Sequence, residues 1–181
     1  MNNIINQSSN KNIFEISKLI VDSKQNGSSV IIPHVCNNKD SFGAGFSGDV
    51  AKHYPIVETN YHILGQTFLN KNPGYVQFVK VYTEPTYDRS LIIANMIAQN
   101  GIRNRNNKRP LNYAYLVKSM FEINQYINRN INTEDTVEIH CPKFGSGLAG
   151  GNWKFIECLI EDIWGKHKVV VYGSQQRILN A

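Results

Sequence analysis

Short apolar runs alternate along the chain with stretches in which apolar residues recur at helical spacing. Ile13, Ile16 and Ile20 follow one another at three- and four-residue intervals, which is typical of a helix with one buried face, and Gly27 marks its expected end. Ser29–Val35 is a nearly continuous apolar run rich in Val and Ile, which is typical of a strand buried on both faces. The first part of the chain therefore predicts a helix followed by a central strand.

The rest of the chain repeats this alternation. Gly45–Tyr54 can form a helix that stops, or restarts, at Pro55. Further strands are predicted over Val76–Tyr82, over Leu91–Ala98, at the alternating residues Val137, Ile139 and Cys141, and over Lys168–Tyr172. Two further helices are predicted by stripes of apolar residues at helical spacing. The first stripe is Tyr113, Leu116, Met120, Ile123 and Ile127, and the second is Trp153, Ile156, Ile160, Ile163 and Trp164. Because strand–helix–strand connections are right-handed crossovers, this order predicts an α/β fold with a largely parallel sheet covered by helices on both faces.

The length of 181 residues suits one domain spanning residues 1–181. Met1–Asn12 is polar and is interpreted as an N-terminal extension or an edge segment rather than as a signal peptide. No apolar stretch approaches the ~20 residues that a bilayer-spanning helix needs, so no membrane association is expected. The expected location is the cytoplasm of a bacterium or, for a viral protein, of the infected host.

The formal net charge of +5 favours anionic partners. The densest basic stretch holds Arg103, Arg105, Lys108 and Arg109 inside an Asn-rich segment. No aromatic residue interrupts that stretch to stack on a base, so a binding platform for single-stranded nucleic acid is not supported by the sequence. A small anionic ligand is therefore the expected partner, and nucleic acid is not.

The chain holds three cysteines, Cys36, Cys141 and Cys158, with no CxxC pair. An odd count without paired spacing argues against a disulfide framework and against a zinc site. Cys141 and Cys158 lie in apolar contexts and are expected to be buried thiols. The histidines show no ligand spacing either, so the sequence predicts no metal and no cofactor.

Two segments with many glycines each follow a predicted strand and lead into a predicted helix. The first is Pro33–Phe46, with glycines at 43 and 45, and the second is Pro142–Trp153, with glycines at 145, 147, 150 and 151. Small residues let a backbone approach a ligand closely, and free amides at a helix start attract phosphate. In parallel sheets such loops meet at the carboxyl edge, so the two segments predict one anion-binding cleft.

Several side chains in these segments allow two interpretations. His34 can be a hydrogen-bonded histidine beneath the loop, or an acid or base beside a phosphate. Asn37 can simply cap the turn, or contact a sugar. Asn152 is explained as the N-cap of the last helix. Phe46 and Trp153 are expected in the core, and Ser41 has no neighbouring base that would make it a nucleophile.

Together these segments resemble the macrodomain family over about Val30 to Gly173. Asn37 resembles the family's ribose-facing asparagine, and Gly43–Phe46 resembles its glycine turn around the ribose and the adjoining phosphate. Gly145–Gly150 resembles the loop that wraps the diphosphate, and Val169–Tyr172 resembles the closing strand. The resemblance implies a three-layer α/β/α macrodomain with a mixed, largely parallel central sheet, which binds ADP-ribose or a phosphorylated derivative.

Pro33–Asn37 and Ala94–Ile102 resemble most closely the ADP-ribose-1″-phosphate phosphatase-like branch of bacteria and phages. The resemblance implies His34 and Asn37 as catalytic residues. It implies as ligand-binding residues Val35, Cys36, Ser41, Phe42, Gly43, Ala44, Gly45, Phe46, Gln99, Gly145, Ser146, Gly147, Leu148, Ala149, Gly150, Gly151 and Asn152.

Two departures from the family pattern bear on function. Residues 1–39 contain no clear Gly-Asp pair of the kind that holds the adenine amino group. Gln99 and Ala149 stand where one glycohydrolase branch has Lys and Asp. Three hypotheses follow: a phosphatase acting on ADP-ribose-1″-phosphate, a non-catalytic binding module, and, least supported, an ADP-ribosyl glycohydrolase.

Overall fold

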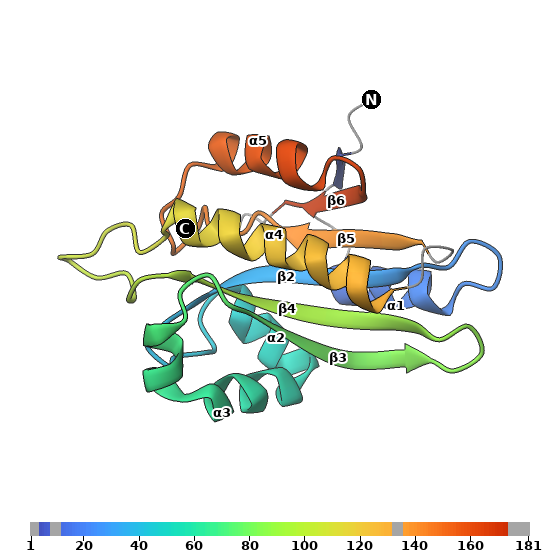
Figure 1. Cartoon of the computed structure of the whole chain (residues 1–181), viewed down its shortest axis with the longest axis horizontal. Coiled ribbons are helices and arrows are strands. Elements are labelled where there is room, and N and C mark those ends of the chain that lie inside the picture. The colour runs from blue at the N-terminus through green and yellow to red at the C-terminus, as the bar shows by residue number, and fades with distance from the viewer. Residues whose placement is uncertain (1–3, 8–11, 132–135, 174–181) are drawn as a thin grey trace, which may run out of the picture.

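A computed structural model describes residues 4–7, 12–131 and 136–173; of the polar N-terminal segment, residues 1–3 and 8–11 lie outside this description. The helices and strands form one sheet with flanking helices (Figure 1). In chain order they are β1 (Ile4–Gln7), α1 (Ile13–Asp22), β2 (Ser29–Asn37), α2 (Phe46–His53), α3 (Pro55–Lys71), β3 (Val76–Glu84), β4 (Arg89–Gln99), α4 (Tyr113–Asn130), β5 (Val137–Pro142), α5 (Trp153–Trp164) and β6 (Lys168–Tyr172).

The sheet has six strands in the order β1-β6-β5-β2-β4-β3. The neighbouring strands are parallel except β3 and β4, which are antiparallel. Helices α4 and α5 cover one face, and α1, α2 and α3 lie on the other (Figure 1). The expected three-layer α/β/α arrangement with a mixed, largely parallel sheet is confirmed.

Residues of the central strand β2 pack into the hydrophobic clusters on both faces of the sheet. Val30, Ile31 and Ile32 are all fully buried. Because successive side chains of a strand point to opposite faces, Ile31 joins the cluster beneath α4 and α5, while Val30 and Ile32 join the cluster on the α1 face. The continuous apolar run is thus explained by burial on both sides of the sheet.

Some local predictions are corrected by the structure. Helix α1 ends at Asp22 with Ser23 as its C-cap, and a turn separates it from Gly27. Pro55 restarts the chain, one of the two alternatives left open, and it begins α3, a helix that the pattern did not predict because few of its residues are buried. Cys141 is buried as expected, but the expectation for Cys158 is wrong, since it lies on the exposed side of α5.

Candidate functional site

A cleft of about 720 Å³ lies at the carboxyl edge of the sheet, where β2, β4 and β5 end. The segment after β2 (residues 38–45, the first loop) and the segment after β5 (residues 143–152, the second loop) face each other across it. Their approach is close, because a Cβ placed on Gly45 would lie 3.5 Å from Cδ1 of Leu148. Parallel topology thus brings together two loops that lie far apart in the sequence.

The predicted site residues divide into two groups. Those that line the cleft are His34, Val35, Ala44, Gly45, Phe46, Gln99, Gly145, Ser146, Gly147, Leu148 and Ala149. The lining does not include Cys36, Asn37, Ser41, Phe42, Gly43, Gly150, Gly151 or Asn152. For the second group, direct contact with a ligand stays a prediction.

The second loop presents unpaired backbone amides to the cleft. Its curvature is fixed by hydrogen bonds from the Gly151 amide to the Gly145 carbonyl (2.7 Å) and from the Gly150 amide to the Gly147 carbonyl (3.0 Å). Within the described residues, the N–H groups of Ser146, Gly147 and Leu148 donate to no acceptor. Consecutive free N–H groups in such a turn form a concave site for an anion.

The glycines of this loop serve different purposes. A Cβ on Gly150 would lie 2.8 Å from the carbonyl oxygen of Lys108, and one on Gly151 would lie 2.7 Å from the carbonyl oxygen of Gly145. Both positions therefore exclude a side chain for packing reasons. Gly147 would meet nothing within 4 Å. At Gly147, which lines the cleft, the space that a side chain would fill is therefore open.

The first loop leads into α2, whose N-terminus also borders the cleft. Gly45 is the N-cap, with φ of 62° and no capping side chain. In the part of the chain that is described, the amides of Phe46 and Ser47 have no acceptor, and the Gly48 amide bonds back to the Gly45 carbonyl at 3.0 Å. Uncapped amides at a helix start carry partial positive charge and attract anions.

Asn37 braces the first loop from within. Its Nδ2 donates to the Ser41 carbonyl at 2.7 Å, and its Oδ1 accepts from the Lys39 amide at 2.8 Å. The hydroxyl of Tyr61 donates to the Asn37 carbonyl at 2.6 Å. Turn capping therefore occupies the amide group of Asn37, and a direct contact with a ribose stays a prediction.

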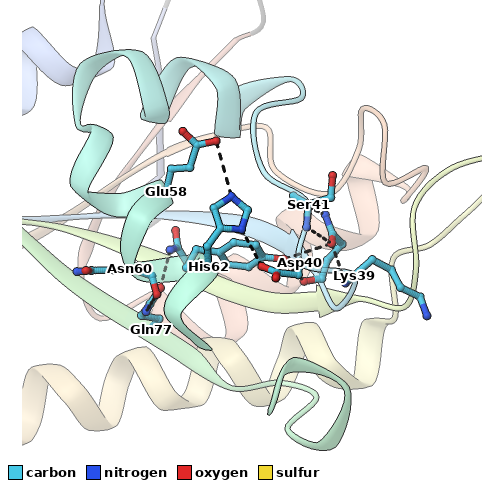
Figure 2. Close-up of polar contacts among 10 residues, drawn as sticks. Lys39, Asp40, Ser41, Glu58, Asn60, His62 and Gln77 are labelled. Atoms are coloured by element: carbon cyan, nitrogen blue, oxygen red, sulfur yellow. Dashed lines mark hydrogen bonds and ion pairs between the residues drawn. The ribbon is translucent and has the colours of Figure 1, made fainter. Parts of the chain in front are cut away.

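A second tie joins this loop to α3, as Figure 2 shows. Nδ1 of His62 lies 2.7 Å from a carboxylate oxygen of Asp40, while its Nε2 lies 3.9 Å from Glu58. Asp40 adopts a φ of 52°, a left-handed conformation that its hydrogen bond with His62 helps to hold. No His, Cys, Asp or Glu residues gather in a group of three or more that could hold a metal ion, as far as the described residues go.

His34 ends a buried chain of side-chain hydrogen bonds. Its Nε2 lies 2.6 Å from Oδ1 of Asn95, whose Nδ2 donates to Oε1 of Gln77 at 3.0 Å. Nε2 of Gln77 in turn donates to the backbone carbonyl of Asn60 at 2.8 Å (Figure 2). A carbonyl can only accept, so the order of donors fixes the orientation of both amides. His34 must therefore carry its proton on Nε2, which leaves Nδ1 unprotonated.

Burial keeps His34 neutral. Its side chain is 2% exposed, with Phe42 and Phe46 packed edge-on to the imidazole ring at 5.8 and 5.6 Å. Desolvation lowers the pKa of His34 to about 4, and the hydrogen bond to Asn95 offsets only part of that effect. At neutral pH His34 therefore cannot act as an acid, and the nitrogen that can accept a proton is Nδ1, which lies 3.8 Å from Sγ of Cys36.

The cleft is also lined by residues that the sequence pattern did not single out. Asn12 and His53 lie side by side, with Nδ2 and Nε2 3.5 Å apart, and the His53 ring stacks on Phe14 at 4.2 Å. Asp49 and Tyr172 also line the cleft. These residues come from the start of α1, from α2 and from β6, far apart in sequence and without a shared motif, so only the fold assembles them.

The cleft therefore offers both positively polarised groups and a carboxylate to a ligand. The second-loop end carries free amides together with Lys143, and Nη1 of Arg103 reaches the Gly147 carbonyl at 3.5 Å. The Asp49 carboxylate, in the first turn of α2, also lines the cleft. A ligand with a strongly anionic part and a neutral, hydrogen-bonding part fits this division.

The chain resembles several known proteins, although no family model matches it. A 17.5 kDa uncharacterized protein of the tk-vs intergenic region of Enterobacteria phage T4 is 25% identical over 142 residues, which is 77% of this chain and 83% of that protein. A protein of unknown function from Bacteroides thetaiotaomicron has a TM-score of 0.72 at 25% identity, over 94% of this chain and 97% of that one.

Two further solved structures are similar in fold. A macrodomain protein from Streptomyces coelicolor has a TM-score of 0.64 at 26% identity, with 93% of this chain and 97% of that chain covered. Thermosipho africanus DarTG, solved in complex with ADP-ribose, has a TM-score of 0.62 at 14% identity, over 81% of this chain and 38% of that one. The latter likeness concerns the fold alone.

Proposed function

Because this chain belongs to the macrodomain family, we propose that its cleft binds ADP-ribose or a phosphorylated derivative of it. The observation that carries this proposal is the pair of segments with free amides that border the cleft, the second loop and the N-terminus of α2. Ser146–Leu148 on one side and Phe46–Ser47 on the other offer donors to a diphosphate without any cation being required. A volume of about 720 Å³ suits a nucleotide-sized ligand.

The proposed site of the base is the part of the cleft where Asn12 and His53 lie side by side. Residues 1–39 hold no clear Gly-Asp pair, and the polar side chains that line the cleft near α2 are those of Asn12, Asp49 and His53. A carboxylate can accept from an exocyclic amine, and the stacked His53 ring adds a flat surface. This assignment gives the neutral part of the ligand a place that the amide-rich end does not.

A second candidate function is hydrolysis of the 1″-phosphate of ADP-ribose-1″-phosphate. The observation in its favour is that His34, with an unprotonated Nδ1, borders the cleft. Because the pKa of His34 is about 4, its share of the reaction would be to orient a water molecule or accept a proton, not to protonate the leaving oxygen. The loop amides would stabilise charge on the transferred group. Asn37 would act by holding the first loop in place.

Binding is nevertheless the function that the geometry supports best. The free backbone amides that would bind the phosphates are all present in the described residues. The basic side chain proposed for catalysis, His34, is buried and weakly basic. Glycohydrolase activity is not proposed, because Gln99 and the buried Ala149 supply neither a cation nor a carboxylate.

Calorimetric titration with ADP-ribose, followed by phosphate release from ADP-ribose-1″-phosphate on the same sample, tests both functions. Saturable binding without release supports a binding module. Release that His34→Gln reduces while affinity is retained supports the phosphatase. Release that is unaffected by His34→Gln would contradict the role given to His34, and absence of binding would contradict the proposal as a whole.

A further inference from the structure

The segment between β4 and α4 (residues 100–112, the basic loop) projects from the left of the molecule in Figure 1. It contains Arg103, Arg105, Lys108 and Arg109 and no Asp or Glu. The neighbouring segment 142–154 adds Lys143 and Lys154, again without a carboxylate. All six cations are exposed, and none forms an ion pair with another described residue. The two segments therefore form one uncompensated positive surface.

Contacts between the segments hold this surface against the cleft. The Leu111 amide donates to the Ala149 carbonyl at 3.1 Å, and a Cβ on Gly150 would touch the backbone of Lys108 and Arg109. Nη1 of Arg103 reaches the Gly147 carbonyl at 3.5 Å. The positive surface is thus continuous with the second loop.

Asparagine side chains keep the basic loop in one conformation. Asn104 and Asn107 exchange backbone hydrogen bonds of 3.1 and 3.2 Å, and Oδ1 of Asn104 accepts from the Asn106 and Asn107 amides at 2.8 and 2.9 Å. Nδ2 of Asn107 donates to the Asn100 carbonyl at 2.9 Å. The asparagines are therefore structural, and the four cations of the loop are left without a carboxylate partner among the described residues.

Aromatic side chains lie beside these cations in space, although none interrupts them in the sequence. The guanidinium of Arg109 lies 5.5 Å from the ring centroid of Tyr113, and Phe155 packs edge-on to Tyr113 at 4.8 Å. Phe155 is 46% exposed and follows Lys154 at the start of α5. The stacking surface that the sequence alone does not offer is thus provided by the fold.

We propose that the basic loop, with Lys143, Lys154 and Phe155, binds the backbone and bases of a single-stranded nucleic acid beside the ligand cleft. Spaced cations match a chain of phosphates, and an exposed aromatic ring stacks on a base of any sequence. An acidic polypeptide would satisfy the cations but would leave Phe155 without a role. This inference goes beyond the proposed ligand function and does not depend on it.

The test is fluorescence anisotropy with a labelled single-stranded DNA of mixed sequence. Arg105 and Lys108 do not line the cleft, so Arg105→Glu/Lys108→Glu leaves the cleft intact. The matched control, Lys24→Glu/Lys166→Glu, makes the same charge change in turns that precede β2 and β6, at the opposite edge of the sheet. We expect the basic-loop variant to bind at least about tenfold more weakly than the control at low salt. The slope of log Kd against log salt should fall by about 0.7 for each phosphate that the variant no longer neutralises.

Two further measurements separate nucleic-acid binding from a general effect of net charge and from an acidic protein partner. Phe155→Ala should weaken DNA binding several-fold, and calorimetry with ADP-ribose should give the same affinity for all of these variants. Equal losses in the basic-loop and control variants would overturn the proposal, because net charge alone would then account for binding. Displacement of the DNA by polyglutamate as readily as by unlabelled DNA would also overturn it, in favour of an acidic protein partner.

Discussion

Nε2 of His34 lies 2.6 Å from Oδ1 of Asn95, and this contact determines which ring nitrogen carries the proton. Asn95 presents its oxygen because its Nδ2 is committed to Gln77. We predict that nitrogen-15 NMR of the imidazole will show the Nε2–H tautomer near neutral pH. Signals typical of the Nδ1–H tautomer would contradict the order of hydrogen-bond donors that runs from Gln77 through Asn95 to His34.

Asn95→Asp changes the charge beside the same nitrogen. A carboxylate there favours the protonated imidazole, so the pKa of His34 should rise well above its value of about 4. An NMR titration of the His34 ring measures this directly. A pKa that stays near 4 would contradict a direct contact between residue 95 and the His34 ring.

The buried His34 should also make stability depend on pH. Its folded pKa is about 4, below the ordinary value of 6.5, so between these values the unfolded chain binds the proton and the folded chain does not. Stability should therefore fall as pH drops from 6.5 to 4, by about 3 kcal/mol from this group. Urea unfolding at several pH values measures the slope. His34→Gln should remove this part of it, and an unchanged slope in that variant would assign the effect to other groups.

Gly147 and Gly150 should respond differently to side chains. Gly147→Glu meets no atom within 4 Å and should fold normally, but its carboxylate would lie where a phosphate is proposed. We expect at least about tenfold weaker ADP-ribose binding, equivalent to about 1.4 kcal/mol. The matched variant Gly147→Gln keeps the size without the charge and should lose less. Equal affinity of Gly147→Glu and the parent protein would remove this loop from the site.

Gly150→Ala tests the packing role of the same loop. Its φ is 73°, and the new Cβ would lie 2.8 Å from the Lys108 carbonyl. We expect a loss of about 1–3 kcal/mol in the free energy of unfolding, measured by urea denaturation. A loss of ligand affinity with no loss of stability would instead show that Gly150 contacts the ligand.

The sequence predicted the sheet strands well because burial on both faces produces continuous apolar runs, as in Val30–Ile32. It did not predict α3, whose few buried residues, Val57, Tyr61 and Leu69, give no clear stripe. Strand β1, only four residues long, is equally hard to detect because it pairs with β6 alone at the edge of the sheet.

The site was predictable only in part. Glycine-rich loops after buried strands identify the phosphate-binding edge, since parallel topology brings such loops together. The part of the cleft lined by Asn12, Asp49 and His53 could not be predicted, because helix packing alone brings those residues together.

Asn152 and Asn37 show the same difference between what the sequence predicts and what only the fold determines. Asn152 accepts from the Lys154 amide at 3.0 Å, so its prediction as the N-cap of the last helix is confirmed. For Asn37 the sequence allowed a turn cap but favoured a sugar contact. Its hydrogen bond to the Ser41 carbonyl shows the cap, which depends on a loop geometry that residue types alone do not specify.

The central claim is that the facing loops bind ADP-ribose. Isothermal titration of the purified protein with ADP-ribose, with Gly147→Glu titrated in parallel, tests it most directly. We expect saturable one-to-one binding by the parent protein and a marked loss in the variant. No binding heat at millimolar ADP-ribose, or the same affinity in both proteins, would contradict the claim.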